Sequence, residues 1–176
     1  MKTKHFIKRI FTLTLLFTLL SFVTYNTHLQ QEIKYKNYLN QKYGFSVDYP
    51  HEILTPQGES GSGDGQIFKS KKTPDNSLTV YRDYLDNLDP DVKFTLEIGF
   101  NKEVKACNQK DSKRKITYKK LDKNFYVLSG HKQNGDIFYQ KTIFVDENLC
   151  TCILEYKEAD KAIFNKISER VFKSFK

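Results

Sequence analysis

The sequence predicts an α+β fold, in which helices cover a central antiparallel β-sheet of about six or seven strands as an α/β/α sandwich. Two observations carry this prediction. Residues 125–145 form two strand-like runs around Asn134-Gly135, a pair typical of a tight β-hairpin turn. Large apolar side chains fall on both faces of that hairpin, so we expect helices to cover part of each face.

The hairpin turn also predicts how the two strands pair. A two-residue type I′ turn at Asn134-Gly135 places Gly130 opposite Tyr139 and Leu128 opposite Lys141. Gly130 would then leave room for the Tyr139 ring to lie over the strand. This reading needs no ligand.

The N-terminal residues 1–30 read as a signal peptide or an N-terminal membrane anchor. Four of the 29 basic residues and none of the 21 acidic ones fall in the first 29 positions, and residues 10–23 are an uncharged apolar run. The run would span about 21 Å as a helix, less than a bilayer core, which favours a cleaved signal. The following residues lack a small-residue cleavage pattern, which favours an anchor. Both routes predict export, to the periplasm or beyond, with membrane contact through residues 10–23 if they are retained.

Residues 31–42 are expected to form a linker or a short helix, and residues 43–176 a single α+β domain. Apolar side chains alternate from Tyr43 to Tyr49, and Pro50 follows, which predicts the first strand. A further strand is predicted at Leu78–Tyr81.

The stretch from Pro56 to Gly65 is rich in glycine and serine and predicts a loop. It lacks the pattern of a phosphate-binding loop, and a strand-like run rather than a helix follows it. Two readings stay open. The loop is either a mobile connection, or a ligand-binding loop with four candidate residues. These are Glu59, Ser60, Asp64 and Gly65.

The second half of the chain predicts two helices and four strands, two of them in the hairpin. One helix is expected to start at Asp89-Pro90 and run to about Cys107, because apolar residues recur every four positions. The C-terminal helix is expected over residues 159–175. The strands are predicted at 116–121, within the hairpin 125–145, and at 149–156.

Residues 110–123 hold seven basic and two acidic side chains. They could bind an anionic partner such as lipid headgroups or polysaccharide. They could equally form a solvated loop and the outer face of a strand, since lysines commonly protect sheet edges.

Several short strings resemble a family of small exported bacterial proteins of unknown function. They include Tyr-Gly-Phe-x-x-x-Tyr-Pro, Gly-Asp-Gly-Gln, Leu-Thr-Val-Tyr and Ile-Phe-Tyr-Gln-Lys, and the resemblance runs from Tyr43 to Lys176. Lys157 departs from the pattern, where a proline is expected. The order of elements is also similar to the PsbP/Mog1-type α/β/α sandwich. These resemblances imply a fold and no catalytic residue.

Three cysteines are the main chemical candidates. Cys150 and Cys152 share one face of a predicted strand, and a covering helix could present Cys107 to either. We therefore predict one disulfide from Cys107 to Cys150 or Cys152 in an oxidising compartment. Three unpaired thiols, or zinc held with His131, are the alternatives.

Two classes of function follow. The first is an exported, non-catalytic cell-envelope protein without a cofactor, which binds an envelope protein or an anionic surface or assists an assembly. The second is a small-ligand-binding or hydrolytic protein that uses the loop at residues 58–65 with His51 or His131. Export and an ordinary net charge in the folded part argue against nucleic acid as a partner.

Overall fold

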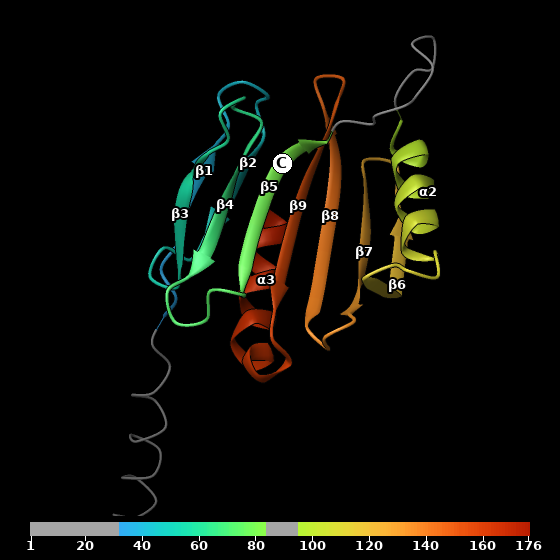
Figure 1. The fold of residues 1–176 in the computed structure, drawn as a ribbon. Helices are drawn as coiled ribbons and strands as arrows, with labels where there is room; N and C mark the ends of the chain where they lie inside the picture. The colour runs from blue at the N-terminus through green and yellow to red at the C-terminus, as the bar shows by residue number, and fades with distance from the viewer. Residues whose placement is uncertain (1–31, 84–94) are drawn as a thin grey trace, which may run out of the picture. The chain divides into compact units, whose positions relative to one another are not determined.

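The computed structural model describes residues 32–83 and 95–176 (Figure 1). The chain divides into two units, Met1–Ile33 and Lys34–Lys176, and only the second is described below. Its elements are β1 Lys36–Leu39, β2 Ser46–Tyr49, β3 Leu54–Glu59, β4 Gly65–Ser70, β5 Ser77–Asp83, α2 Leu96–Cys107, β6 Arg114–Leu121, β7 Phe125–Lys132, β8 Ile137–Val145, β9 Asn148–Tyr156, the 3₁₀ turn Glu158–Asp160 and α3 Lys161–Ser174.

The predicted central sheet is confirmed. Seven strands pair in the order β3-β4-β5-β9-β8-β7-β6, and every neighbouring pair is antiparallel. Strands β1 and β2 form a separate two-stranded sheet. Both edges of the large sheet are poor templates for further pairing, because β3 carries Pro56 and a register shift and β6 is rich in lysine.

The cross-strand pairs define two faces of the large sheet. The front face carries Tyr126, Leu128 and Phe138, and the back face carries Cys150 and Cys152. Helix α2 packs on the front face, where Leu96, Phe100 and Val104 meet the buried cluster of Tyr126, Leu128 and Phe138. Helix α3 packs on the back face, where Phe172 lies on Tyr139 and Phe164 stacks on Tyr156.

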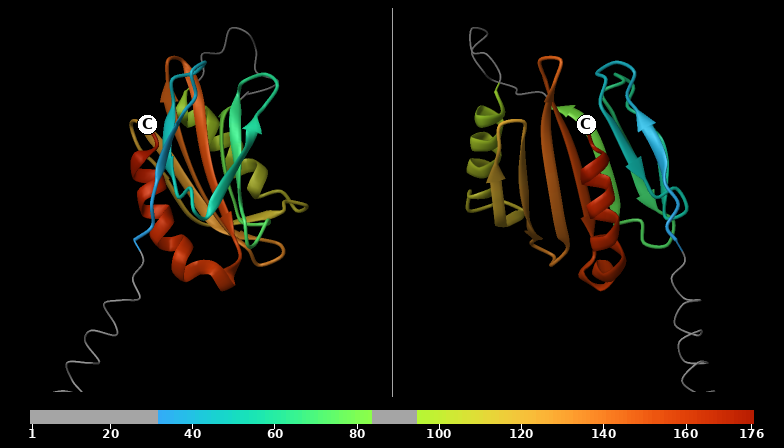
Figure 2. Two further views of the ribbon diagram at one scale, coloured as in Figure 1. Left: turned by 90° about the vertical axis from the view of Figure 1, so that its left-hand side faces the viewer. Right: turned by 180° about the vertical axis from the view of Figure 1, so that it is seen from behind.

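The covering elements lie over opposite halves of the sheet. Helix α2 contacts β6, β7 and β8 on the front, whereas α3 contacts β2 and β9 on the back (Figure 2). The β1–β2 pair also packs on the back face, with Tyr38 and Tyr49 against Phe68 of β4. Among the described residues, the front face is therefore uncovered over β3–β5, and the back face is uncovered over β6 and β7.

Residues 36–39 form strand β1, whereas the sequence predicts a linker or a short helix there. The strand pairs residue by residue with β2, from Lys36 opposite Tyr49 to Leu39 opposite Ser46. Its Tyr38 ring contacts Phe45 and Phe68, both almost fully buried. Packing against residues that come later in the chain decides this element.

The hairpin between β7 and β8 is present, but its predicted register is wrong. The Lys132 N–H donates to the carbonyl of Asp136, and the Gly135 N–H donates to the carbonyl of Lys132. Gly135 has a φ of 85° and Asn134 does not have a positive φ, so the loop has three residues rather than two. Gly130 consequently lies opposite Phe138 rather than Tyr139.

The tight turn with two positive φ angles lies between β8 and β9 instead. Asp146 and Glu147 have φ values of 44° and 64°, and Val145 pairs with Asn148. Side chains with a Cβ atom are strained in this region of backbone space. We therefore expect Glu147→Gly to raise the free energy of unfolding by about 0.5–1 kcal/mol in urea titrations. Glu147→Ala is the control, since it keeps the Cβ atom, and an equal gain from it would contradict the strain.

Helix α2 begins at Leu96 rather than at Asp89-Pro90. Thr95 is extended, with φ −138° and ψ 158°, and its side chain accepts a hydrogen bond from the Ile98 N–H as an N-cap. The predicted start at residues 89–90 lies outside the described residues. The predicted end at Cys107 and the predicted C-terminal helix are confirmed.

Candidate functional site

The predicted ligand loop is a short, internally bonded turn between β3 and β4. Glu59 ends β3 and Gly65 begins β4, so residues 60–64 form the turn itself. The Ser60 hydroxyl accepts a hydrogen bond from the Asp64 N–H at 2.9 Å, and the Ser60 carbonyl accepts one from the Gly63 N–H at 2.8 Å. These bonds define the backbone path of the turn.

Residues of the turn between β1 and β2 form hydrogen bonds to this loop. The Asn40 amide donates to the Gly63 carbonyl at 2.9 Å, and the Lys42 ammonium donates to the Ser62 carbonyl at 2.8 Å. The Tyr43 hydroxyl donates to the Asp64 carboxylate at 3.0 Å. Backbone and side-chain groups of the loop are therefore bonded to a neighbouring hairpin, which favours a fixed turn over a mobile connection.

Asn40 is the centre of this attachment, and Asn40→Ala is expected to lower the free energy of unfolding by about 2–3 kcal/mol. Its side chain is 1% exposed, and its oxygen also accepts from the backbone N–H groups of Lys42 and Tyr43. Truncation leaves these groups without their partner. Asn37→Ala is the control, because Asn37 is exposed and makes one side-chain bond, to Asp48. Equal losses in urea titrations would contradict the central role of Asn40.

The loop, β4 and β5 enclose a pocket of about 470 Å³. It is lined by all four residues that the sequence predicts as a ligand loop, Glu59, Ser60, Asp64 and Gly65. Their polar atoms are already engaged, since Glu59 accepts from the Tyr38 hydroxyl at 2.8 Å and Ser60 lies 3.3 Å from the Ser62 hydroxyl. Such a pocket can accommodate a small polar group.

The structure brings neither predicted histidine to this pocket. His51 lies in the turn before β3, and the loop follows the opposite end of that strand, about 15–20 Å away. His131 lies on β7, which β5, β9 and β8 separate from β4 in the sheet. The hydrolytic arrangement of His51 or His131 with the loop is therefore not assembled in the part of the chain that the structure describes.

The predicted disulfide from Cys107 is also wrong in this structure. All three cysteines are free thiols. Cys150 and Cys152 point to the back face, whereas Cys107 ends the helix that packs on the front face. The sheet lies between the thiols. The prediction assumed that this helix covers the cysteine side of the sheet.

We expect three free thiols with very different reactivity. Burial raises the pKa of Cys150 to about 12 and also raises the pKa of Cys152 and of the partly exposed Cys107. Because the thiolate is the reactive form, iodoacetamide at pH 8 should modify only Cys107 in the folded protein, and slowly. Mass spectrometry should then count three adducts after denaturation without reductant. A single adduct after denaturation would establish a disulfide instead.

Within residues 32–83 and 95–176, no three His, Cys, Asp or Glu side chains are grouped so that they could hold a metal ion. The same ranges contain no helix that is both long and apolar enough to cross a membrane.

The arrangement of strands and helices is similar to that of a solved structure, cyanobacterial PsbP (CyanoP) from Synechocystis sp. PCC 6803. The two chains are 15% identical, with a TM-score of 0.56 over 84% of this chain and 95% of that chain. The chain has a PsbP-like fold. No family model and no curated protein matches the sequence. At this identity the similarity shows the fold alone.

The front face of the PsbP-like fold carries a charged network that the sequence does not reveal. The Glu155 carboxylate accepts from the Arg114 guanidinium at 2.7 Å and from the Lys132 ammonium at 3.1 Å, and Arg114 lies 5.0 Å from the Phe138 ring centre. Burial opposes the ionisation of Glu155, but the two cations outweigh it and lower its pKa. The three residues come from β9, β6 and β7, so only the fold brings them together.

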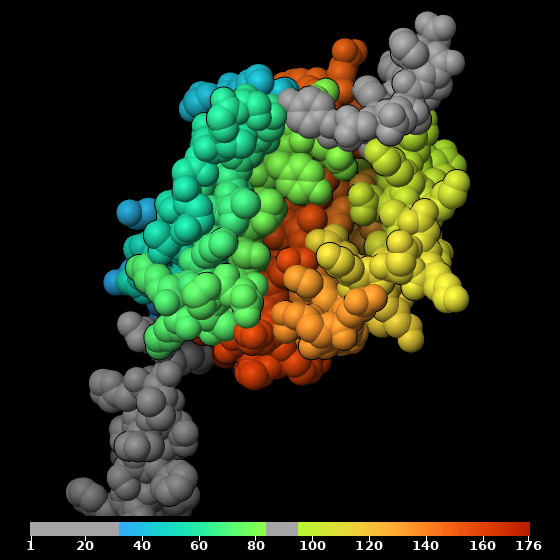
Figure 3. Space-filling view, in the orientation of Figure 1, coloured from blue at the N-terminus to red at the C-terminus, as the bar shows by residue number. Residues whose placement is uncertain are grey.

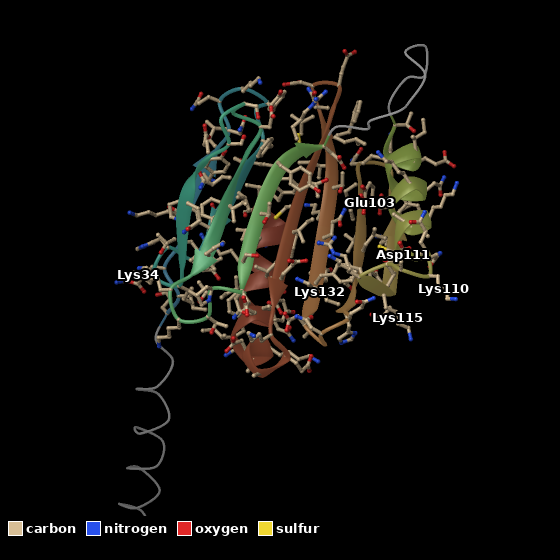
Figure 4. All side chains as sticks on the ribbon, in the orientation of Figure 1. Lys34, Glu103, Lys110, Asp111, Lys115 and Lys132 are labelled. Atoms are coloured by element: carbon tan, nitrogen blue, oxygen red, sulfur yellow. The ribbon has the colours of Figure 1, made fainter. Side chains whose placement is uncertain are left out.

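The same region is hollowed between β5 and α2 (Figure 3). Glu103 of α2 lies near it, and Figure 4 labels Glu103 and Lys132 at separate places on this side of the sheet. Burial, and the negative charge of Asp83, raise the pKa of Glu103. The hollow therefore combines a carboxyl group that resists ionisation with an ion-paired one. The neighbouring protein groups explain the pKa shifts of both Glu103 and Glu155, so neither shift calls for a ligand.

The uncovered half of the back face carries tyrosines and lysines, and we call it the Tyr–Lys surface. It consists of Lys115, Tyr118 and Lys120 of β6 and Phe125, Ser129 and His131 of β7, and it is bordered by Tyr139 and Lys141 of β8, which contact α3. Tyr118 is 51% exposed, and Lys115 and His131 are exposed. The lysine-rich run at 110–123 indicated part of this surface. The strand pairing shows that Tyr118 of this run lies on the same face as Tyr139.

Proposed function

We propose that this chain is an exported, non-catalytic protein of the cell envelope, which binds a partner through the Tyr–Lys surface. The observation that carries the proposal is Tyr118, a large aromatic side chain that is 51% exposed on the part of the back face over β6 and β7, where no described helix packs. Exposed aromatic residues among polar ones are typical of interaction sites.

Two further observations support the proposal. The basic residues and the apolar run at 10–23 are typical of an export signal. The polar groups of the predicted ligand loop bond mainly to other protein groups, as the Gly63 carbonyl does to Asn40 and the Asp64 carboxylate to Tyr43, which favours a structural role for the loop. The PsbP-like fold is compatible with binding and transfers no activity.

Photo-cross-linking in intact cells tests this function. A photoreactive phenylalanine replaces Tyr118 in one variant and Ile163 in another, since Ile163 is 40% exposed on α3 and lies outside the Tyr–Lys surface. We expect cross-linked adducts in the envelope fraction from position 118 and few from position 163. Adducts from neither position, or equally from both, would contradict the proposal, as would recovery of the chain in the cytoplasm.

A further inference from the structure

We propose that the partner of the Tyr–Lys surface is an acidic polysaccharide, whose sugar rings pack on the tyrosines and whose carboxylates meet the lysines. This inference rests on the proposed function, because it assumes that the Tyr–Lys surface is where the partner binds. It adds the chemical class of that partner.

Two tyrosines form one straight row across the strands. Tyr118 of β6 pairs with Ser129 of β7, and Ser129 pairs with Tyr139 of β8. Their Cα atoms are thus two strand spacings apart, or about 9.6 Å, with only a small serine between them. Phe172 of α3 packs on the Tyr139 ring, with the ring centres 4.6 Å apart, so the row is bounded by α3 at Tyr139 and is open at Tyr118. A sugar chain can therefore stack on Tyr118 and meet the exposed part of Tyr139 at the edge of α3.

Basic side chains flank this row on both sides. Lys120 and Lys141 lie in one neighbouring row, and their ammonium groups are 5.4 and 5.5 Å from the Phe125 ring centre. Lys115 and His131 lie in the row on the other side.

The cations of this surface differ in their availability. Lys141 donates to the carbonyls of Phe172 and Phe175, and Lys120 pairs with Asp122 at 2.9 Å. Lys115 has no carboxylate within 4 Å among the described residues, and it is exposed. The back-facing positions of β6, β7 and β8 include no acidic residue. The surface therefore complements a negatively charged partner.

Burial distinguishes a polysaccharide from a lipid bilayer. A bilayer would be contacted by exposed aliphatic side chains, which insert between lipid headgroups. On this face Val127, Ile137 and Ile143 are only 8–9% exposed. Tyrosine presents an apolar ring together with a hydroxyl, which suits the C–H faces and hydroxyl groups of sugars. A sugar ring would thus stack on the Tyr118 ring, and the lysines would pair with the carboxylates of the polysaccharide.

The test measures retention of the full chain, in a mild non-ionic detergent, on polygalacturonate beads. We expect retention that weakens with salt and is absent on neutral dextran beads. Lys115→Gln with Lys120→Gln should weaken the affinity about tenfold or more. Lys71→Gln with Lys72→Gln removes the same charge from exposed residues in the turn between β4 and β5, and should change the affinity less than about twofold.

A second pair of variants separates ring stacking from lipid contact. Tyr118→Phe should retain most binding, whereas Tyr118→Leu keeps an apolar side chain and should lose it. If Tyr118→Leu binds normally and phosphatidylglycerol micelles displace the chain from the beads, the partner is a lipid surface and the proposal is overturned. If both double lysine variants lost the same affinity, the binding would be general charge attraction, and the proposal would also be overturned. No retention, combined with protein adducts from position 118, would refute the polysaccharide and leave the proposed function standing.

Discussion

Gly130→Ala is expected to destabilise the domain by about 3 kcal/mol or more. A Cβ atom at Gly130 would lie 1.9 Å from the Lys115 carbonyl oxygen and 3.0 Å from the Ile116 Cα atom. These are backbone atoms of β6, so no side-chain rotation relieves the overlap. Strand β6 would have to separate from β7, and it carries part of the contact with α2.

Urea titration of Gly130→Ala against Gly61→Ala measures this effect. Gly61 has no positive φ, and a Cβ atom there meets nothing within 4 Å, so its variant should unfold within about 0.5 kcal/mol of the parent. If the alanine at 130 were tolerated equally well, β6 could not approach β7 as closely as described. The distinction matters for function, because Lys115 and Tyr118 of the Tyr–Lys surface lie on β6.

Phe138→Ala is expected to lower the free energy of unfolding by about 3–5 kcal/mol. Phe138 is 0% exposed and belongs to the cluster with Tyr126 and Leu128 beneath α2. The Arg114 guanidinium also lies over its ring. Truncation therefore removes core contacts and leaves the charged network of the front face over a cavity.

Tyr139→Ala is the matched comparison, since the adjacent residue points to the back face and is half-buried. We expect it to lower the free energy of unfolding by about 1–2 kcal/mol, because the substitution removes the contact with Phe172, but the Tyr139 ring already faces solvent in part.

Denaturant midpoints of the two variants also test the register of the hairpin. The pairing predicted for a two-residue turn puts Tyr139 on the face of Gly130 and Leu128, so a larger loss at Tyr139 than at Phe138 would support that pairing instead.

Local patterns predicted most elements of this fold. The strands β5 to β9 and the C-terminal helix were predicted because period-two and period-four spacing of apolar residues is a property of each segment alone. Strand β1 was missed because Tyr38 finds its contacts on Phe45 and Phe68. The hairpin register was missed because Asn134-Gly135 fits both a two-residue and a three-residue loop, and the close approach of β6 at Gly130 enters only in the folded sheet.

The candidate site divides in the same way. Glu59, Ser60, Asp64 and Gly65 line one pocket because they are neighbours in the chain. Their attachment to Asn40 and Tyr43 comes from a different hairpin, and no spacing in the sequence indicates it. The pairing of Glu155 with Arg114 and Lys132 likewise joins three strands that are distant along the chain.

The sequence by itself determined most of the strands and helices, with β1 as an exception, since side-chain alternation and helical spacing are local. It could not determine which face of the sheet each helix covers, because both faces of the β7–β8 hairpin are apolar enough to be buried. The face that each helix covers is decided only by packing in the folded protein. This packing places α2 on the front face, which separates Cys107 from Cys150 and Cys152, and α3 over the other half of the back face. The same packing leaves Tyr118 and Lys115 exposed, with no helix of residues 32–83 and 95–176 packed on them.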